Sequence, residues 1–143
     1  MKTRLLDINL LLALSWSHHV HHELAHQWLA HSRSSRFAYC TVTQLGFVRI
    51  SLQPAFAPGL ATAVELRARL VAFFQSHRGV FLAEPAQGID DPVLASRLDA
   101  ILTAAQVTDA YLTGLAAFHK AVVVTLDQSL VNLHPGFAEL ARI

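Results

Sequence analysis

The sequence predicts an α/β domain in which a central, mostly parallel β-sheet is flanked by helices. Short apolar runs that suit buried strands alternate along the chain with longer segments whose apolar residues recur at helical spacing. The strongest run, Ala-Val-Val-Val-Thr-Leu at 121–126, is rich in β-branched residues. The chain is 143 residues long, the size of one ordinary domain, and no linker divides it. We therefore expect one domain over residues 1–143.

The expected elements follow from these patterns in chain order. Strands are expected at 3–6, 37–40, 80–83 and 121–126. Helices are expected at 10–14, 19–30, 43–50, 62–74, 91–102 and 108–118. Thr62 with Glu65 forms a capping box at the start of one helix. Asp91 followed by Pro92 marks the start of another, and Thr108 is a candidate cap for the last.

Composition limits the classes of partner. Hydrophobic residues make up 53% of the chain and charged residues 15%, and the mean hydropathy is +0.39. Such an apolar composition indicates that a partner or a second copy covers part of the surface. The net charge of +1 excludes the strong basic field of many nucleic-acid binders. Any contact with RNA would therefore rest on local arginines and bound metal.

The chain is expected to be cytoplasmic. The single cysteine, Cys40, excludes an internal disulfide and suits a reducing compartment. Leucines near the N-terminus are typical of a secretory signal, but Asp7 and Asn9 interrupt the apolar stretch and no small-residue cleavage site follows. No run approaches the roughly 18 apolar residues that a membrane span needs, so no membrane association is expected.

Three carboxylates adjoin strongly apolar segments. Asp7 ends the first expected strand, Asp127 follows the last, and Asp109 begins the helix between them. In open parallel sheets, polar groups at the carboxyl ends of strands lie at the ligand-binding edge. Two carboxylates about 4 Å apart repel by roughly 4 kcal/mol at an effective dielectric constant near 20, which a hard divalent cation would relieve. The alternative is that each Asp is only a favourable helix-start or turn residue.

Four segments carry a family resemblance. They are Leu6–Leu11, Thr41–Arg49, Val107–Leu112 and Val124–Asp127. In this order they resemble the PIN-domain ribonucleases, and in particular the VapC toxins of VapBC toxin–antitoxin pairs. The resemblance implies a PIN-like fold in which Asp7, Asp109 and Asp127 hold Mg²⁺ or Mn²⁺ for hydrolysis of RNA by metal-activated water. It also implies a VapB-type antitoxin partner and a homodimer.

Gln44 departs from the pattern of that family, in which most members have Glu at this position. A Gln offers a carbonyl oxygen to a metal or to a bound water, but it brings no negative charge. We therefore treat Gln44 as a weak ligand or a residue that orients a ligand, with a partly exposed helix residue as the alternative. Other carboxylates are available elsewhere in the chain, and the sequence does not select among them: Glu23, Asp90, Asp91 and Asp99.

Several polar residues are candidate auxiliary groups. Asn9 is placed to orient Asp7 or a metal-bound water, or else to cap a helix. Thr125 and Ser129 flank Asp127 and are candidates for binding water or a phosphate oxygen, unless they are only structural. Arg49 is the candidate RNA phosphate contact, with pairing to a buried acid as the alternative.

A histidine-rich segment supports a rival interpretation. His22-Glu23-Leu24-Ala25-His26 matches H-E-x-x-H, in which two histidines on one helix face bind Zn²⁺ and Glu acts as general base. A zinc metallopeptidase needs a third protein ligand, and Leu29 and Ser32 occupy the positions where one extended form of the motif has Gly and His. The simpler interpretation is that these histidines lie on the solvent-exposed face of an ordinary helix. A third hypothesis is a non-catalytic PIN-like interaction module, which both the apolar excess and Gln44 permit.

Overall fold

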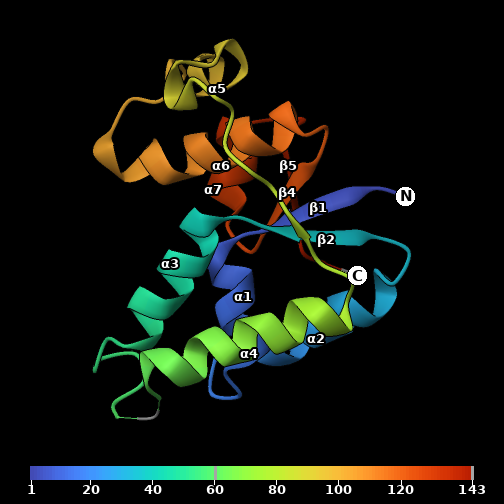
Figure 1. Ribbon diagram of the computed structural model, residues 1–143, viewed down its shortest axis with the longest axis vertical. Coiled ribbons are helices and arrows are strands. Elements are labelled where there is room, and N and C mark those ends of the chain that lie inside the picture. The colour runs from blue at the N-terminus through green and yellow to red at the C-terminus, as the bar shows by residue number, and fades with distance from the viewer. Residues whose placement is uncertain (60, 143) are drawn as a thin grey trace.

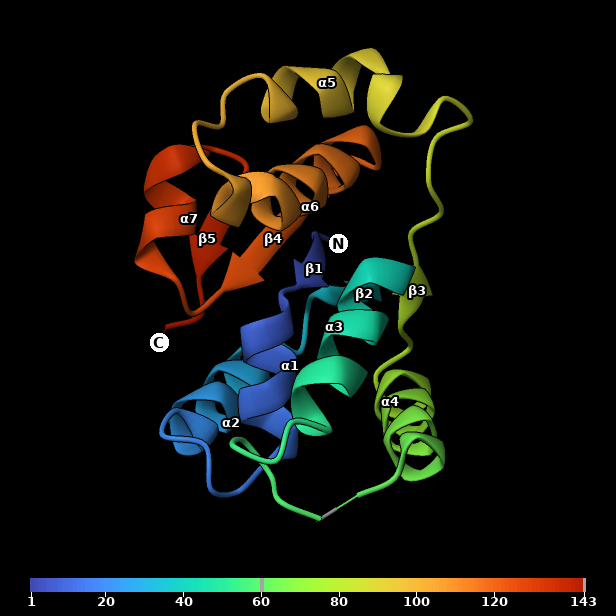
Figure 2. The ribbon, with the colours of Figure 1, turned by 90° about the vertical axis from the view of Figure 1, so that its left-hand side faces the viewer.

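A five-stranded parallel sheet lies between two layers of helices in the computed structural model, which describes residues 1–59 and 61–142 (Figure 1 and Figure 2). The strands are β1 Thr3–Leu6, β2 Arg36–Tyr39, β3 Val80–Phe81, β4 Val122–Thr125 and β5 Ala138–Leu140. The helices are α1 Ile8–Ser15, α2 His22–His31, α3 Thr41–Ser51, α4 Ala63–Ser76, α5 Pro92–Leu98, α6 Val107–Phe118 and α7 Gln128–Leu133. Two 3₁₀ turns, η1 Gly88–Asp90 and η2 Ala104–Gln106, complete the order. The predicted α/β class is confirmed.

Successive residues of the central strands point to opposite layers. Leu6 of β1 and Val124 of β4 pack into the cluster formed with α1 to α4. Their neighbours Leu5 and Val123 pack into a second cluster with α6 and α7. Figure 2 shows α1 to α4 on one side of the sheet and α5 to α7 on the other. Because both faces are covered, these strands read as continuous apolar runs rather than as alternating patterns.

The strand order reverses at the centre of the sheet, between β1 and β4. The order is β3-β2-β1-β4-β5, so the chain moves outward from β1 in one direction and later returns to β4 on its other side. Leu6 of β1 lies beside Val124 of β4 in parallel register. In such sheets, ligands bind outside the carboxyl ends of the two strands at which the order reverses. That position is occupied here by the residues that follow β1 and β4.

Two of the expected helix starts are confirmed, and one is wrong. The Thr62 hydroxyl accepts a hydrogen bond from the backbone N–H of Glu65 at 3.3 Å, and the Asp91 carboxylate accepts one from Val93. Thr108, in contrast, lies inside α6, which begins at Val107. At the start of η2, the Gln106 side chain instead accepts a hydrogen bond from the backbone N–H of Thr103 at 3.3 Å, and η2 runs directly into α6.

The end of the chain forms elements that the sequence patterns did not predict. The short helix α7 and the edge strand β5, with the sequence Ala-Glu-Leu, have too few residues to show a period. The expected helix 91–102 is also shorter, because α5 ends at Leu98. The side chain of Leu102 is 88% exposed and so has no core contact to hold a further turn.

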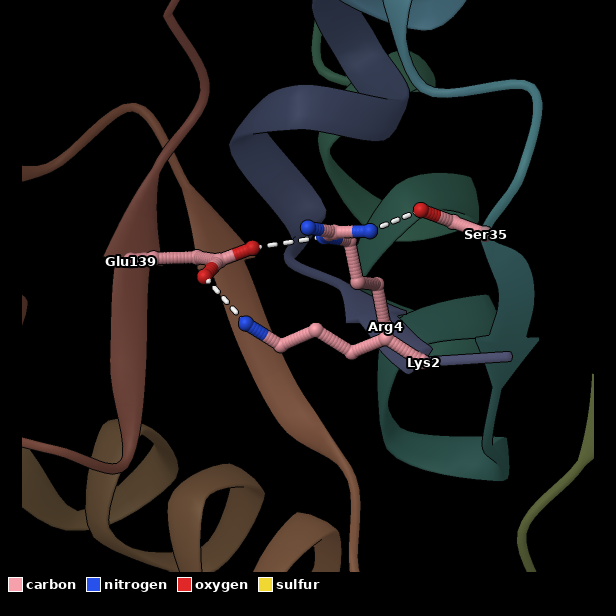
Figure 3. A network of polar contacts seen from close by, with 4 residues as sticks. All are labelled: Lys2, Arg4, Ser35 and Glu139. Atoms are coloured by element: carbon pink, nitrogen blue, oxygen red, sulfur yellow. Dashed lines mark hydrogen bonds and ion pairs between the residues drawn. The ribbon is translucent and has the colours of Figure 1, made fainter.

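A polar network fixes β5 to the rest of the sheet (Figure 3). The Glu139 carboxylate accepts hydrogen bonds from Lys2 Nζ at 2.8 Å and from Arg4 Nε at 2.6 Å. Arg4 also donates to the hydroxyl of Ser35, which precedes β2. Burial raises the pKa of Glu139, but the hydrogen bonds and charges of Lys2 and Arg4 outweigh it and hold that pKa below its ordinary value. This network compensates for the small apolar content of β5.

None of the helices in the described residues has the length and apolar character to cross a bilayer.

Close packing of α5 on α6 predicts the effect of one substitution. A Cβ added at Gly114 would lie 2.9 Å from the backbone Cα of Leu94, which cannot move as a side chain can. We expect Gly114→Ala to lower the free energy of unfolding by about 1–3 kcal/mol, although Ala favours a helix over Gly by roughly 1 kcal/mol. Thr108→Ala, at an exposed position of the same helix, should change it by less than about 0.5 kcal/mol. Denaturant unfolding measures both, and equal stability of Gly114→Ala and the native protein would contradict the packing.

Candidate functional site

Asp7 lies at the junction of β1, α1 and β4. Its backbone N–H donates to the carbonyl of Val124 at 2.9 Å, which continues the β1–β4 pairing. Its Oδ1 accepts from the backbone N–H of Ile8 at 2.8 Å, so Asp7 is the N-cap of α1. Its Oδ2 accepts from the hydroxyl of Thr125 at 2.7 Å. The carboxylate is therefore buried, yet it is held by two donors and by the positive end of a helix.

Thr125 is the centre of the hydrogen bonds around Asp7. While its hydroxyl donates to Asp7, its oxygen accepts from Asn9 Nδ2 at 3.2 Å and from the backbone N–H of Asp127 at 3.0 Å. A hydroxyl has one donor and two acceptor positions, so this set is complete. Thr125 is also fully buried. It positions Asp7 and has no group left to contact a phosphate.

Asn9 joins the start of α1 to the end of β4. Besides its bond to Thr125, its Oδ1 accepts from the backbone N–H of Leu126 at 3.2 Å. The N-cap of α1 is Asp7, so the alternative in which Asn9 caps this helix is wrong. Asn9 instead orients the residues on either side of Asp7.

Asp127 begins α7 directly after β4. Its Oδ1 accepts from the backbone N–H of Ser129 at 2.9 Å and from the Ser129 hydroxyl at 2.6 Å, so Asp127 is the N-cap of α7. Ser129 thus supports this cap. The second carboxylate oxygen of Asp127 has no hydrogen-bond partner within the described residues.

Asp109 completes the acidic group from the first turn of α6. Burial raises its pKa to about 6, and the charges of Asp7 and Asp127 contribute in the same direction. Burial also raises the pKa of Asp7, with a smaller contribution from Asp127, although the hydrogen bonds from Thr125 and Ile8 oppose this. The three carboxyl groups, from β1, α6 and the end of β4, are therefore close enough to act on one another electrostatically.

The oxygen donors of Asp7, Asp109 and Asp127 suit a divalent ion, but the spacing of the three side chains does not. Three carboxylates, of which Asp7 and Asp109 have raised pKa values, offer the oxygen donors that suit a hard divalent cation such as Mg²⁺ or Mn²⁺. However, no three Asp, Glu, His or Cys side chains in residues 1–59 and 61–142 are arranged closely enough to hold an ion. Asp7 and Asp127 each accept, through Oδ1, a hydrogen bond from the first turn of the helix that they cap. The donors fit a divalent ion, but the side chains are not drawn together as a ligand cluster.

The other two expected site residues lie on α3. Gln44 is half-buried and borders hollows between α3 and α4 together with Leu70 and Val71. No hydrogen bond links its side chain to an Asp among the residues that the structure describes. Arg49 is exposed in the last turn of α3, and no ion pair to a buried acid is found there within the described part of the chain. Hydrogen bonds thus join Asp7, Asn9, Thr125 and Asp127, and Asp109 lies within electrostatic reach of them, whereas no hydrogen bond joins Gln44 or Arg49 to this group among the described residues.

One cation at this edge was missed by sequence reasoning. Arg142 is the second residue after β5, and the preceding Ala141 donates its backbone N–H to the carbonyl of Thr125 at 2.8 Å. Arg142 is exposed beside the strand end that carries Asp127. No sequence pattern identified Arg142 as a site residue, because the strand that precedes it, β5, was not predicted.

The histidine motif has a structural explanation. The last carbonyls of a helix lack partners within it, and in α1 two of them are bound by histidine rings. His22 Nδ1 lies 2.7 Å from the carbonyl oxygen of Ala13, and His26 Nε2 lies 2.8 Å from that of Leu14. Arg69 donates to the carbonyl of Ser15 at 3.1 Å. The two histidines of H-E-x-x-H therefore cap α1, and the zinc metallopeptidase interpretation lacks its third ligand within the described residues.

The chain is similar to curated proteins over nearly its whole length. It is 39% identical over 129 residues to ribonuclease VapC44 of Mycobacterium tuberculosis, covering 88% of this chain and 87% of that protein. It is 35% identical over 129 residues to ribonuclease VapC38 of the same organism, covering 90% and 88%. For ribonuclease VapC29 the identity is 34% over 142 residues, covering 96% of each. No family model matches the chain.

A solved structure shares the fold. The crystal structure of PAE2754 from Pyrobaculum aerophilum is similar with a TM-score of 0.59 at 22% sequence identity, covering 98% of this chain and 90% of that chain. At this identity the similarity concerns the fold alone. The curated relatives go further, because several of them match most of the chain at 34–39% identity. On that basis the chain belongs to the VapC family of PIN-domain toxins.

Proposed function

We propose that this protein is a metal-dependent endoribonuclease, the toxin of a type II toxin–antitoxin system, and that it hydrolyses RNA phosphodiester bonds. The observation that carries the proposal is that Asp7 and Asp127 follow the neighbouring strands β1 and β4, where they and Asp109 influence one another electrostatically. The relatives named as ribonucleases support the choice of RNA as substrate.

Asp7, Asp109 and Asp127 would hold Mg²⁺ or Mn²⁺. When bound, the ion supplies an activated water and stabilises the charge that develops on the phosphodiester. Asp7 is kept oriented by Thr125 and Ile8, and Thr125 is in turn kept oriented by Asn9. The pKa of Asp109 is raised to about 6, so metal and proton compete for this carboxyl group.

Gln44 is assigned an auxiliary role. It brings no charge, and its side chain borders the hollows toward α4. The affinity for metal then depends on three carboxylates, and we expect it to be lower than in relatives that have Glu at this position.

RNA is proposed to bind through local arginines. Arg142 lies beside the end of β4, and Arg49 is exposed on α3. With a net charge of only +1 the chain has no broad positive field, so these individual side chains must supply the phosphate contacts.

The proposed partners are a VapB-type antitoxin and a second copy of this chain, in the cytoplasm. Exposed apolar residues support an apolar partner surface. Leu45 of α3 and Val71 of α4 are more than half exposed and border the same hollow, which measures about 340 Å³. Leu102 and Val107 expose further apolar surface in the other layer.

Substitution of Asp109 tests the nuclease proposal. We expect Asp109→Asn to lower RNA cleavage in Mg²⁺ or Mn²⁺ at least about 100-fold, because loss of one metal ligand removes several kcal/mol of charge stabilisation. Purified protein and a labelled RNA give the rate, and induced expression gives the effect on growth. Asp99→Asn, at an exposed residue after α5, is the matched control and should behave as the native protein.

Two outcomes would contradict this assignment. Equal growth arrest and RNA cleavage by native protein and Asp109→Asn would exclude the carboxylate site. Growth arrest by native protein, Asp7→Asn and Asp109→Asn without any RNA cleavage would support a non-catalytic PIN-like interaction module.

The raised pKa of Asp109 predicts how stability depends on pH and metal. Between the ordinary pKa of 3.8 and about 6, the folded state binds more protons at Asp109 than the unfolded state. The free energy of unfolding of the metal-free protein should therefore fall as pH rises through this interval. Because the group is only half-buried and solvent screens it, we expect Asp109→Asn to gain about 1 kcal/mol at pH 7.5 over the native protein.

Thermal unfolding with and without Mg²⁺ measures these effects. Mg²⁺ or Mn²⁺ should raise the Tm of the native protein and of Asp99→Asn, and should raise that of Asp109→Asn much less. A metal-free Asp109→Asn that is less stable than the native protein at pH 7.5 would show that the carboxylate is not under repulsion.

A further inference from the structure

We propose that His22 and His26 form a second metal site, of two imidazole ligands, that binds a borderline transition-metal ion such as Ni²⁺, Cu²⁺ or Zn²⁺. This site is distinct from the carboxylate site in both place and chemistry. Asp7 caps the first residue of α1, whereas the two histidines bind carbonyls near its last. Because α1 has eight residues, the two ends are about 12 Å apart.

The placement of the two rings suits a shared ion. His22 and His26 are four residues apart on α2 and therefore lie on one face of the helix. Their ring centroids are 4.5 Å apart, and the ring planes are inclined at 60°. Two imidazoles bound to one ion through nitrogens about 2.0–2.1 Å from it have centroids roughly 4.5–5 Å apart. The two centroids already lie at that separation.

The hydrogen bonds of each ring leave one nitrogen available. A carbonyl oxygen only accepts, so the bonds to Ala13 and Leu14 require a proton on His22 Nδ1 and on His26 Nε2. In the neutral rings the other nitrogens, His22 Nε2 and His26 Nδ1, then carry lone pairs, and they have no hydrogen-bond partner among the described residues. Metal-binding histidines typically donate their other N–H to a backbone carbonyl or a carboxylate, which fixes the tautomer. Both rings already have that arrangement.

The surroundings select the class of ion. In the described residues no third His, Cys, Asp or Glu completes a cluster, so water must fill the remaining positions. His22 is half-buried and His26 is exposed, which leaves the pair open to solvent. Imidazole suits Zn²⁺, Cu²⁺ and Ni²⁺, whereas Mg²⁺ and Mn²⁺ prefer carboxylate oxygens. The negative end of the α1 dipole also favours a cation at this position.

Calorimetric titration of the full chain with NiCl₂ tests the site. The protein is stripped with EDTA and then kept in excess Mg²⁺, so that hard-ion sites are occupied. The variants are His22→Gln, His26→Gln and both together, because the Gln amide retains a donor for the α1 carbonyls. His31→Gln is the matched control, since His31 lies on the same helix and its Nδ1 is bonded to the carbonyl of Gln27. Cu²⁺ bound to the native protein is examined by electron paramagnetic resonance.

We expect one equivalent of Ni²⁺ to bind to the native protein and to His31→Gln. Each single variant should weaken binding at least about tenfold, since loss of an outer-shell partner alone costs a metal site about 10–100-fold. The Cu²⁺ spectrum should show coupling to two imidazole nitrogens. Affinity should follow the order Mn²⁺ below Ni²⁺ below Cu²⁺.

Three results would overturn the site. They are absence of saturable Ni²⁺ binding to the native protein, undiminished binding by the double variant, and a Cu²⁺ spectrum without two coupled nitrogens. Undiminished binding would assign the ion to the preceding histidines His18, His19 and His21. The spectrum is recorded on the native protein, so it decides the question even if the double variant does not fold.

Discussion

Burial of the Asp7 carboxylate between β1 and β4 sets the conditions for the rest of the molecule. A buried carboxylate is unfavourable unless hydrogen bonds and positive charge stabilise it. Here a helix N-terminus, the backbone N–H of Ile8 and the hydroxyl of Thr125 meet that requirement. The Thr125 hydroxyl is available only because the two strands lie side by side in parallel register. The same arrangement leaves Asp109 and Asp127 near Asp7, so the fold itself creates the excess negative charge that we propose a cation relieves.

Much of the fold was predictable from the sequence, because most of its elements are long or strongly apolar. The central strands are covered on both faces, so their residues are apolar throughout and stand out as runs. Elements with other sources of stability were not predictable. β5 is held by the ion pairs of Glu139, and α7 is a short turn of helix capped by Asp127. Neither source of stability leaves a periodic pattern.

The candidate site was predictable in its acidic residues but not in their connections. The strand-end rule identified Asp7 and Asp127 because it depends only on where apolar runs stop. Which hydroxyl contacts which carboxylate depends on register across strands far apart in sequence, so the sequence left open whether Thr125 binds water, binds a phosphate oxygen or is only structural, and it did not predict the bond to Asp7. The motif His22-Glu23-Leu24-Ala25-His26 shows the reverse case. Its spacing places both histidines on one face, but the neighbour on that face is the end of α1, which a local motif does not reveal.

The bond between Thr125 and Asp7 joins residues that are 118 positions apart in the chain. Because β4 is added to the sheet beside β1, the acidic group does not exist in any fragment that ends before residue 125. Contacts of such long range form late, since the loop between them must close first. A chain emerging from the ribosome therefore has no assembled acidic centre until β4 and Asp127 have been made. If the protein cuts RNA as proposed, this topology delays the onset of cleavage, and so protects the RNA of the ribosome that is synthesising it.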